Sequence, residues 1–348
     1  MVNYWLEMGV DGFRCDVIHS ISKDFSAPEG GGIGPHLHEY LHELHTRAFG
    51  PHGALTIGET WNLTAAQMLE LTGRTRGELT AAFQFEHLML GRENGDKFRR
   101  SAFDRAAFTD ILARWDKALR DDGCPVLVLE NHDQPRALSR FGDSRYPRES
   151  ATMLAALVYG MRGIAVVYQG QELGLENPVF PALDAYRDIE TIHAAQALAG
   201  TLDETALLDA LNFGSRDNAR VPMPWSGAPN GGFTTGTPWI SASFDPQRTV
   251  AAEEADPDSV LQFYRRLLRL RQADAVLRRG DFTLLLNEGG TVVYRRSLGA
   301  DVRLVVARFS DAEAPLPEIV PPEAECLLCN YPDPGAALRP YEARILKV

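Results

Sequence analysis

Three short apolar runs, each closed by an acidic residue, constrain the fold more than any other feature of this sequence. They are residues 9–18 with Asp16, residues 54–61 with Glu59, and residues 125–133 ending at Asp133. Each run has the length and apolar content of a buried strand, and a segment with helical periodicity follows each one. Strand, acid and helix in repeated succession form the layout of a (β/α) barrel, whose reacting groups lie at the carboxyl ends of its strands. We therefore expect the three acids to meet at one rim.

Five strands and the helices between them are predicted, which is too few to close an eight-stranded barrel. The strands are expected at 9–18, 55–59, 80–86, 126–130 and 164–168, and the helices at 1–8, 36–49, 64–71, 104–120, 148–161 and 257–272. We expect residues 1–275 to form the C-terminal part of a (β/α)8 TIM barrel, with an elaborated loop region at about 176–255. Short alternating runs predict an antiparallel β-sandwich domain at 276–348.

Two opposite charges, Arg14 and Asp16, stand inside the first run. Residues two apart on a strand face the same side. We expect both side chains to be buried, and we expect the cation to keep the carboxylate ionised. An ionised, oriented aspartate suits a nucleophile or a metal ligand. Taken alone, a purely structural ion pair explains the two residues equally well.

The sequences around the three acids resemble those of the α-amylase superfamily of retaining α-glycosidases. The stretches that carry the resemblance are Gly12-Phe13-Arg14-Cys15-Asp16, Gly58-Glu59 and Asn131-His132-Asp133. Others are similar to the oligo-1,6-glucosidase and dextran glucosidase branch: Asp16-Val17-Ile18 with Ile21-Ser22-Lys23, Gly58-Glu59-Thr60-Trp61, Phe83-Gln84-Phe85-Glu86-His87, and Arg216-Asp217-Asn218-Ala219-Arg220-Val221-Pro222-Met223. The resemblance implies that the five predicted strands are strands 4 to 8 of the family's barrel. It also implies that the first three strands are missing.

The resemblance gives each acid a role in a double-displacement mechanism. It implies that Asp16 is the nucleophile and that Glu59 is the general acid and base. Trp61 is expected to give Glu59 a partly apolar wall, which favours a protonated acid. Asp133 is expected to bind sugar hydroxyls more tightly as the transition state forms.

The resemblance further implies a set of substrate-binding residues: Arg14, Val17, Trp61, His132, Arg216 and Arg220. His132 would donate a hydrogen bond to the sugar that Asp133 holds. Val17 resembles the residue found in the branch that prefers α-1,6 linkages. Two alternatives stay open: Arg216 and Arg220 could instead hold their loop through Asp–Arg pairs, and Trp61 could pack in the core instead of stacking on a sugar.

The net charge and the cysteine content limit the classes of binding partner and the cellular compartment that we expect. The formal net charge of −12 argues against nucleic acid and anionic membranes, and it fits a neutral oligosaccharide substrate. No apolar run approaches the ~20 residues that span a bilayer, and no signal-peptide pattern is visible. The Cys326–Cys329 spacing lacks a second pair, so packed thiols are expected rather than zinc. We expect a cytoplasmic protein without cofactor or metal.

The expected activity is hydrolysis of α-1,6 or α-1,4 glucosidic bonds at the non-reducing end of short oligosaccharides. A transglucosidase or a sucrose-cleaving enzyme would use the same acids, and a non-catalytic interaction subunit is a further alternative. The resemblance implies that the missing strands supply part of the glucose pocket. The chain alone is therefore expected to have little or no activity, and it could require a separately encoded N-terminal half.

Overall fold

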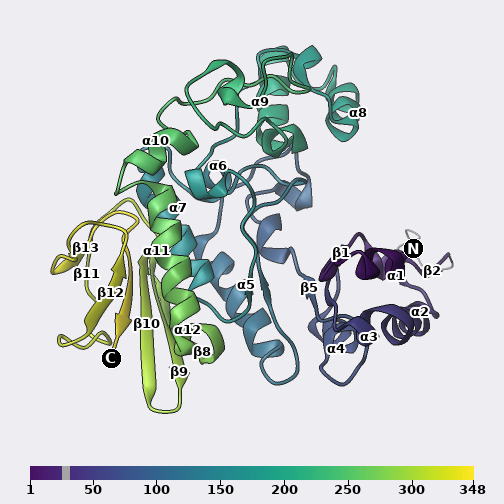
Figure 1. Cartoon of the computed structure of the whole chain (residues 1–348). Helices are drawn as coiled ribbons and strands as arrows, with labels where there is room; N and C mark the ends of the chain where they lie inside the picture. The colour runs from purple at the N-terminus through teal and green to yellow at the C-terminus, as the bar shows by residue number, and fades with distance from the viewer. Residues whose placement is uncertain (26–31) are drawn as a thin grey trace. The chain divides into compact units, whose positions relative to one another are not determined.

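The computed structural model describes residues 1–25 and 32–348, which divide into two compact units. Unit 1 comprises Met1–Glu86, Ile111–Leu127 and Arg162–Val166, and unit 2 comprises His87–Asp110, Val128–Met161 and Val167–Val348. Figure 1 labels the elements in chain order. The helices are α1 Val2–Glu7, α2 Leu37–Leu44, α3 Gly50–His52, α4 Ala65–Thr72, α5 Arg105–Ala118, α6 Ala137–Phe141, α7 Pro147–Tyr159, α8 Ile189–Leu198, α9 Glu204–Gly214, α10 Val250–Ala255, α11 Val260–Ala273 and α12 Ala275–Arg279.

The five predicted barrel strands are all present, and all five lie in unit 1. They are β1 Gly12–Cys15, β4 Leu55–Glu59, β5 Ala81–Phe83, β6 Val126–Leu127 and β7 Ile164–Ala165. The first three form a parallel sheet in the order β1-β4-β5, and β6 pairs in parallel with β7. Parallel strands separated by helices confirm the prediction of a partial (β/α) barrel. A separate two-stranded ladder joins β2 Lys23–Asp24 to β3 Gly32–Ile33.

Two apolar clusters hold the strands of unit 1 to their helices. One contains Ile18, Leu37, Leu41, Leu71 and Leu79, which places α2 and α4 against the turn that follows β1. Another joins Met68 of α4 to Ala82 of β5 and to Trp115 and Leu119. Helix α4 begins at a capping box in which the side chains of Thr64 and Gln67 each accept a main-chain hydrogen bond from the other residue.

Unit 2 contains the predicted C-terminal antiparallel sheet. Its strands are β8 Asp281–Glu288, β9 Thr291–Leu298, β10 Asp301–Arg308, β12 Glu325–Cys329 and β14 Ala343–Lys347, in the order β12-β14-β10-β9-β8. A smaller ladder pairs β11 Ala314–Pro315 with β13 Ala337–Leu338. Figure 1 shows β8, β9 and β10 as long neighbouring strands, and their ladders are antiparallel throughout.

Buried arginines and a tyrosine tie this sheet and α11 to the end of α7. Tyr294 of β9 donates to the carbonyl of Leu157 at 2.8 Å, and Arg296 donates to the carbonyl of Gly160 at 2.6 Å. Arg271 of α11 donates to the carbonyl of Tyr159 at 2.6 Å. A guanidinium satisfies helix-terminal carbonyls that have no partner within the helix, which explains why these cations are buried.

Residues 176–255 depart from the prediction of an elaborated loop, because they contain the helices α8, α9 and α10. Asp188 and Asp203 cap the first two through hydrogen bonds to the main-chain N–H groups of Thr191 and Ala206. The barrel strands β1, β5, β6 and β7 are also shorter than predicted, because the ladders end before the apolar runs do, for example at Val128 and Leu129 after β6.

Three further findings concern compartment and cofactors. Cys15, Cys124, Cys326 and Cys329 are free thiols. None of the helices in the described ranges combines the length and apolar character needed to cross a membrane. Within those ranges, no three His, Cys, Asp or Glu side chains gather into a group that could bind a metal ion.

Gly163 provides a test of how β6 and β7 approach each other. Its φ is +141°, and a Cβ added there would lie 2.4 Å from the carbonyl oxygen of Pro125. We expect Gly163→Ala to lower the free energy of unfolding by about 1–3 kcal/mol, because it adds both backbone strain and a main-chain clash. Urea denaturation followed by circular dichroism measures the loss.

The matched control is Gly227→Ala, where an added Cβ meets no atom within 4 Å. We expect this substitution to leave the unfolding transition nearly unchanged. Equal stability of the two variants would contradict the packing described for the strands.

Candidate active site

One guanidinium group, that of Arg14, contacts two of the three predicted acids. Strands β1 and β4 are parallel neighbours with Cys15 opposite Gly58, so the residues that follow lie at the same end of the sheet. Arg14 Nη1 donates to Oδ1 of Asp16, which comes directly after β1. Arg14 Nη2 lies 2.8 Å from Oε2 of Glu59, the last residue of β4. The two carboxylates therefore lie within reach of a single guanidinium.

The exposure of this pair differs from the prediction. The side chain of Asp16 is 76% exposed and that of Arg14 is 34% exposed, whereas that of Glu59 is 6% exposed. The expectation of a buried Arg14–Asp16 pair was wrong. Strand β1 pairs with β4 along one edge only, and no other described strand covers its second edge.

Glu59 receives hydrogen bonds on both carboxylate oxygens. The indole N–H of Trp61 donates to Oε1 at 3.1 Å, and the main-chain N–H of Val17 donates to Oε2 at 3.1 Å. The predicted apolar wall is therefore incomplete, because Trp61 presents its polar edge to the acid. The face of the Trp61 ring packs against Phe85, with the ring centroids 4.5 Å apart.

Val17 has a left-handed backbone conformation, with φ of +34° and ψ of +41°. This region is unfavourable for a β-branched residue and costs of order 1–3 kcal/mol. The conformation starts the short 3₁₀ helix Ile18–Ser20, and the N–H of Val17 reaches Glu59. Sequence reasoning placed Val17 in the site, but gave no sign of this backbone conformation.

The third acid, Asp133, belongs to unit 2 together with three other predicted site residues. Arg220 Nη2 lies 2.5 Å and Arg216 Nη1 lies 3.4 Å from Asp133 Oδ1. The Nε2 of His132 lies 3.2 Å from Asp133 Oδ2, and Arg220 Nε donates to the carbonyl of His132 at 2.9 Å. These four side chains therefore form one cluster in unit 2.

Arg216 does form an Asp–Arg pair, but its partner is not Asp217, the acid inside its own motif. Asp217 accepts hydrogen bonds from the main-chain N–H groups of Arg187 and Asp188, at 2.6 and 3.0 Å. The partner of Arg216 is Asp188, whose Oδ1 accepts from Arg216 Nε at 2.9 Å and from Nη2 at 2.5 Å.

Asp188 is the residue that sequence reasoning missed. It is 3% exposed, it lies between Arg216 and Arg220, and it also caps α8. Burial opposes its ionisation, but hydrogen bonds from Arg216 and Thr191 outweigh this effect and lower the pKa of Asp188. The spacing of Asp188 and Thr191, followed by an Ala-rich stretch, was an available helix-start signal.

A fully buried ion pair lies near the His132–Asp133 segment in the chain. Arg136 Nη1 lies 2.9 Å from Glu130 Oε1, and both side chains are 1% exposed. Arg136 also donates to the carbonyl of Gln169 at 2.7 Å, and Glu130 accepts from the N–H of Ala137 at 2.5 Å. The pair fixes the segment that carries His132 and Asp133.

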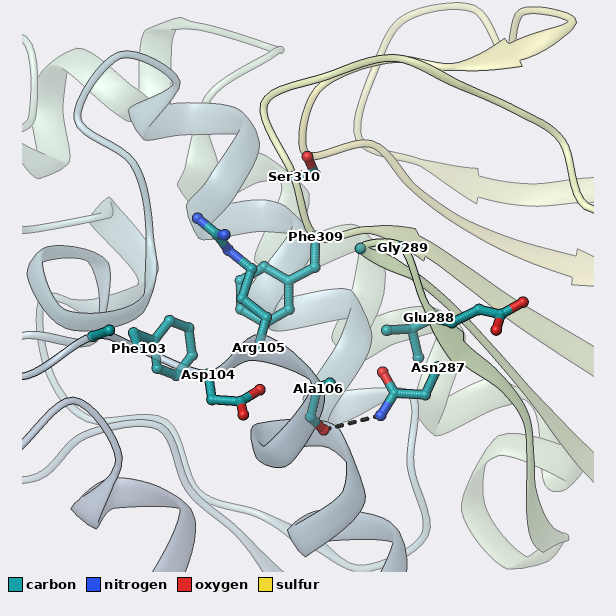
Figure 2. Close-up of a pocket in the computed structure, with 12 residues that line it drawn as sticks. Phe103, Asp104, Arg105, Ala106, Asn287, Glu288, Gly289, Phe309 and Ser310 are labelled. Atoms are coloured by element: carbon teal, nitrogen blue, oxygen red, sulfur yellow. Dashed lines mark hydrogen bonds between the residues drawn. The ribbon is translucent and has the colours of Figure 1, made fainter.

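A cavity of about 550 Å³ in unit 2 contains none of the predicted site residues. Figure 2 shows its wall, with Phe309 beside Arg105 and with Asn287 donating to the carbonyl of Ala106 at 2.9 Å. It lies between the start of α5 and the turn that joins β8 to β9. The predicted chemistry therefore does not involve this cavity.

The buried ion pair yields a prediction for stability. Arg136→Met would leave Glu130 buried without its cation, which costs about 3–5 kcal/mol at neutral pH. Burial already raises the pKa of Glu130, and removal of Arg136 takes away the largest opposing influence. A carboxyl group whose pKa is higher in the folded state than in the unfolded state stabilises the fold at pH values below the unfolded pKa. This stabilisation is lost as the pH rises through the folded-state pKa.

Arg136→Met should accordingly lose more of the free energy of unfolding at pH 8 than at pH 5, as measured by urea unfolding at the two pH values. Arg47→Met is the control, since the side chain of Arg47 is 78% exposed and pairs only with Glu43 among the described residues. A deficit independent of pH would contradict the assignment of Glu130 as the stranded charge.

Comparison with known proteins identifies the family of the chain. Residues 1–280 match the family described as "Alpha amylase, catalytic domain". The chain is 36% identical to an oligo-1,6-glucosidase of Parageobacillus thermoglucosidasius, covering 100% of this chain and 67% of the relative.

Two solved structures are also similar. The trehalose-6-phosphate hydrolase of Bacillus licheniformis has a TM-score of 0.91 at 34% identity, over 99% of this chain and 66% of that one. The isomaltulose synthase of Klebsiella sp. LX3 has a TM-score of 0.90 at 29% identity, over 99% of this chain and 66% of that one. The chain thus spans about two thirds of the length of these relatives, and it belongs to the α-amylase family of glycoside hydrolases.

Proposed function

We propose that the chain carries the catalytic acids of a retaining α-glucosidase that cleaves α-1,6 or α-1,4 bonds at the non-reducing end of short oligosaccharides. The observation that supports this most strongly is the shared guanidinium of Arg14, which keeps the carboxylates of Asp16 and Glu59 close together. Retaining enzymes need their two carboxyl groups only about 5–5.5 Å apart. The five-stranded arc would correspond to strands 4 to 8 of the barrel.

In the first step, an oxygen of Asp16 attacks the anomeric carbon while Glu59 donates a proton to the departing glycosidic oxygen. The bond to the leaving sugar breaks as the bond to Asp16 forms. In the second step, Glu59 takes a proton from water, and the resulting hydroxide displaces Asp16. Two inversions retain the α configuration. The Arg14 cation favours the anionic form of Asp16, and the N–H groups of Val17 and Trp61 hold the side chain of Glu59 in position.

Asp133 and His132 would bind the hydroxyls of a glucose unit, held in place by Arg216 and Arg220. Charge-assisted hydrogen bonds to a sugar hydroxyl can strengthen as positive charge develops on the ring. Since the relatives are longer than this chain, part of the pocket would come from a polypeptide that carries the remaining strands, such as a separately encoded N-terminal half. The free cysteines suit a cytoplasmic setting.

The test is turnover of p-nitrophenyl α-glucoside and isomaltose by the chain, compared with Asp16→Asn. We expect weak turnover by the chain alone and none above background for the variant, because an amide cannot attack the anomeric carbon. Asp11→Asn is the matched control, a like substitution before β1 at the other end of the strand, and it should behave as the unsubstituted chain. Equal turnover by Asp16→Asn would exclude Asp16 as nucleophile, and robust turnover by the chain alone would show that the missing strands are not required.

A transglucosidase is the second candidate, and the similarity to an isomaltulose synthase supports it. Both reactions pass through the same glucosyl intermediate, and they differ in whether water or a sugar accepts the glucose. Incubation with isomaltose separates them, because a hydrolase yields only free glucose and a transglucosidase also transfers glucose to a second sugar to form longer oligosaccharides. A non-catalytic interaction subunit would give neither product.

A further inference from the structure

Asp188 is the centre of a buried charge network in unit 2. Its Oδ1 accepts both Arg216 Nε and Arg216 Nη2, and the same oxygen lies 3.7 Å from Arg220 Nη1. Its Oδ2 accepts the N–H and the hydroxyl of Thr191, at 3.2 and 2.9 Å. Oδ2 therefore caps α8, and Oδ1 binds the arginine side chain.

Both arginines also contact Asp133. Arg216 reaches Asp133 with the nitrogen that Asp188 does not bind, and Arg220 reaches it with Nη2. A guanidinium is planar and rigid, so a fixed Nε determines where its other nitrogens lie. The position of Asp188 consequently sets the direction from which both cations approach Asp133.

The anchoring of Asp188 is itself rigid. Its main-chain N–H donates to Asp217 at 3.0 Å, and the hydroxyl of Thr191 lies 2.8 Å from that of Ser215. Asp217 and Ser215 both border Arg216 in the chain. The helix start and the arginine loop are thereby joined at two points besides the ion pairs.

The charges in this network are balanced. Asp133, Asp188 and Glu190 face Arg216, Arg220 and Lys97, with Lys97 2.8 Å from Glu190 and Glu190 3.2 Å from Arg216 Nε. Removal of the charge on Asp188 would leave Arg216 and Arg220 with an excess of positive charge directed at Asp133 and Glu190.

We propose that Asp188 is a positioning residue of the glucose pocket, which acts through Arg216 and Arg220 to orient Asp133 toward the sugar. This proposal rests on the function proposed above. A residue that served only as a helix cap would have no need of its second oxygen, whereas here that oxygen holds the cation that contacts Asp133.

Asp188→Asn separates the two roles, because asparagine caps helices as well as aspartate does but carries no charge. The probe is 1-deoxynojirimycin, a glucose-shaped inhibitor, with binding to the full chain measured by calorimetry. We expect at least a ten-fold loss of affinity, as for other hydrogen-bonded charge pairs that lose one partner. Asp203→Asn is the matched control, since Asp203 caps α9 in the same way and has no arginine partner among the described residues. It should bind as the unsubstituted chain does.

A double-mutant cycle with Asp133→Asn distinguishes positioning from a general loss of structure. If Asp188 acts through Asp133, the second substitution should add little to the first, both in affinity and in the urea midpoint of unfolding. Additive effects in both measurements, or unchanged affinity in Asp188→Asn, would overturn the proposal. If the unsubstituted chain does not bind the inhibitor, as an incomplete pocket would cause, the unfolding cycle alone decides the coupling of Asp188 to Asp133, and additive effects on unfolding would overturn the proposal.

Discussion

The ion pairs of Arg14 with Asp16 and Glu59 are the interaction on which the arrangement of the two acids in unit 1 depends. Parallel pairing of β1 with β4 brings the two acids to the same end of the sheet, but two adjacent carboxylates repel each other. A cation between them removes that repulsion and fixes both side chains. Because Glu59 is buried and Asp16 is exposed, the same cation serves two different environments.

Cations also hold Asp133, the predicted acid in unit 2, and here there are more of them. Two arginines and a histidine surround Asp133, and Asp188 forms ion pairs with both arginines. Each of the three predicted acids is thus oriented by a guanidinium that a second acid also contacts. Such an arrangement limits the freedom of the site side chains before any sugar binds, which lowers the entropic cost of binding.

The sequence predicted the barrel strands and the C-terminal sheet because apolar periodicity is local. It did not predict α8 and α9, since proline, glycine and aromatic residues around them masked two capped helices. The burial of Arg14 and Asp16 was misjudged for a different reason: exposure depends on which strand lies beside β1, and residues 9–18 hold no information about that neighbour. The left-handed backbone of Val17 runs against the preference of a β-branched residue, and Asp188 meets Arg216 only across 28 residues of chain. Motif similarity predicted a set of site residues, whereas the contacts that support their side chains had to come from the structure.

Capture of the glucosyl intermediate tests the central claim most directly. The chain would be incubated with 5-fluoro-α-glucosyl fluoride, which forms the covalent intermediate but slows its hydrolysis, and then digested for peptide mass spectrometry. One turnover per molecule is sufficient, so even a chain with little steady-state activity reports its nucleophile. The account predicts a glucosyl adduct on Asp16 that disappears in Asp16→Asn. An adduct on another residue, an adduct that persists in the variant, or no adduct in the unsubstituted chain would contradict it.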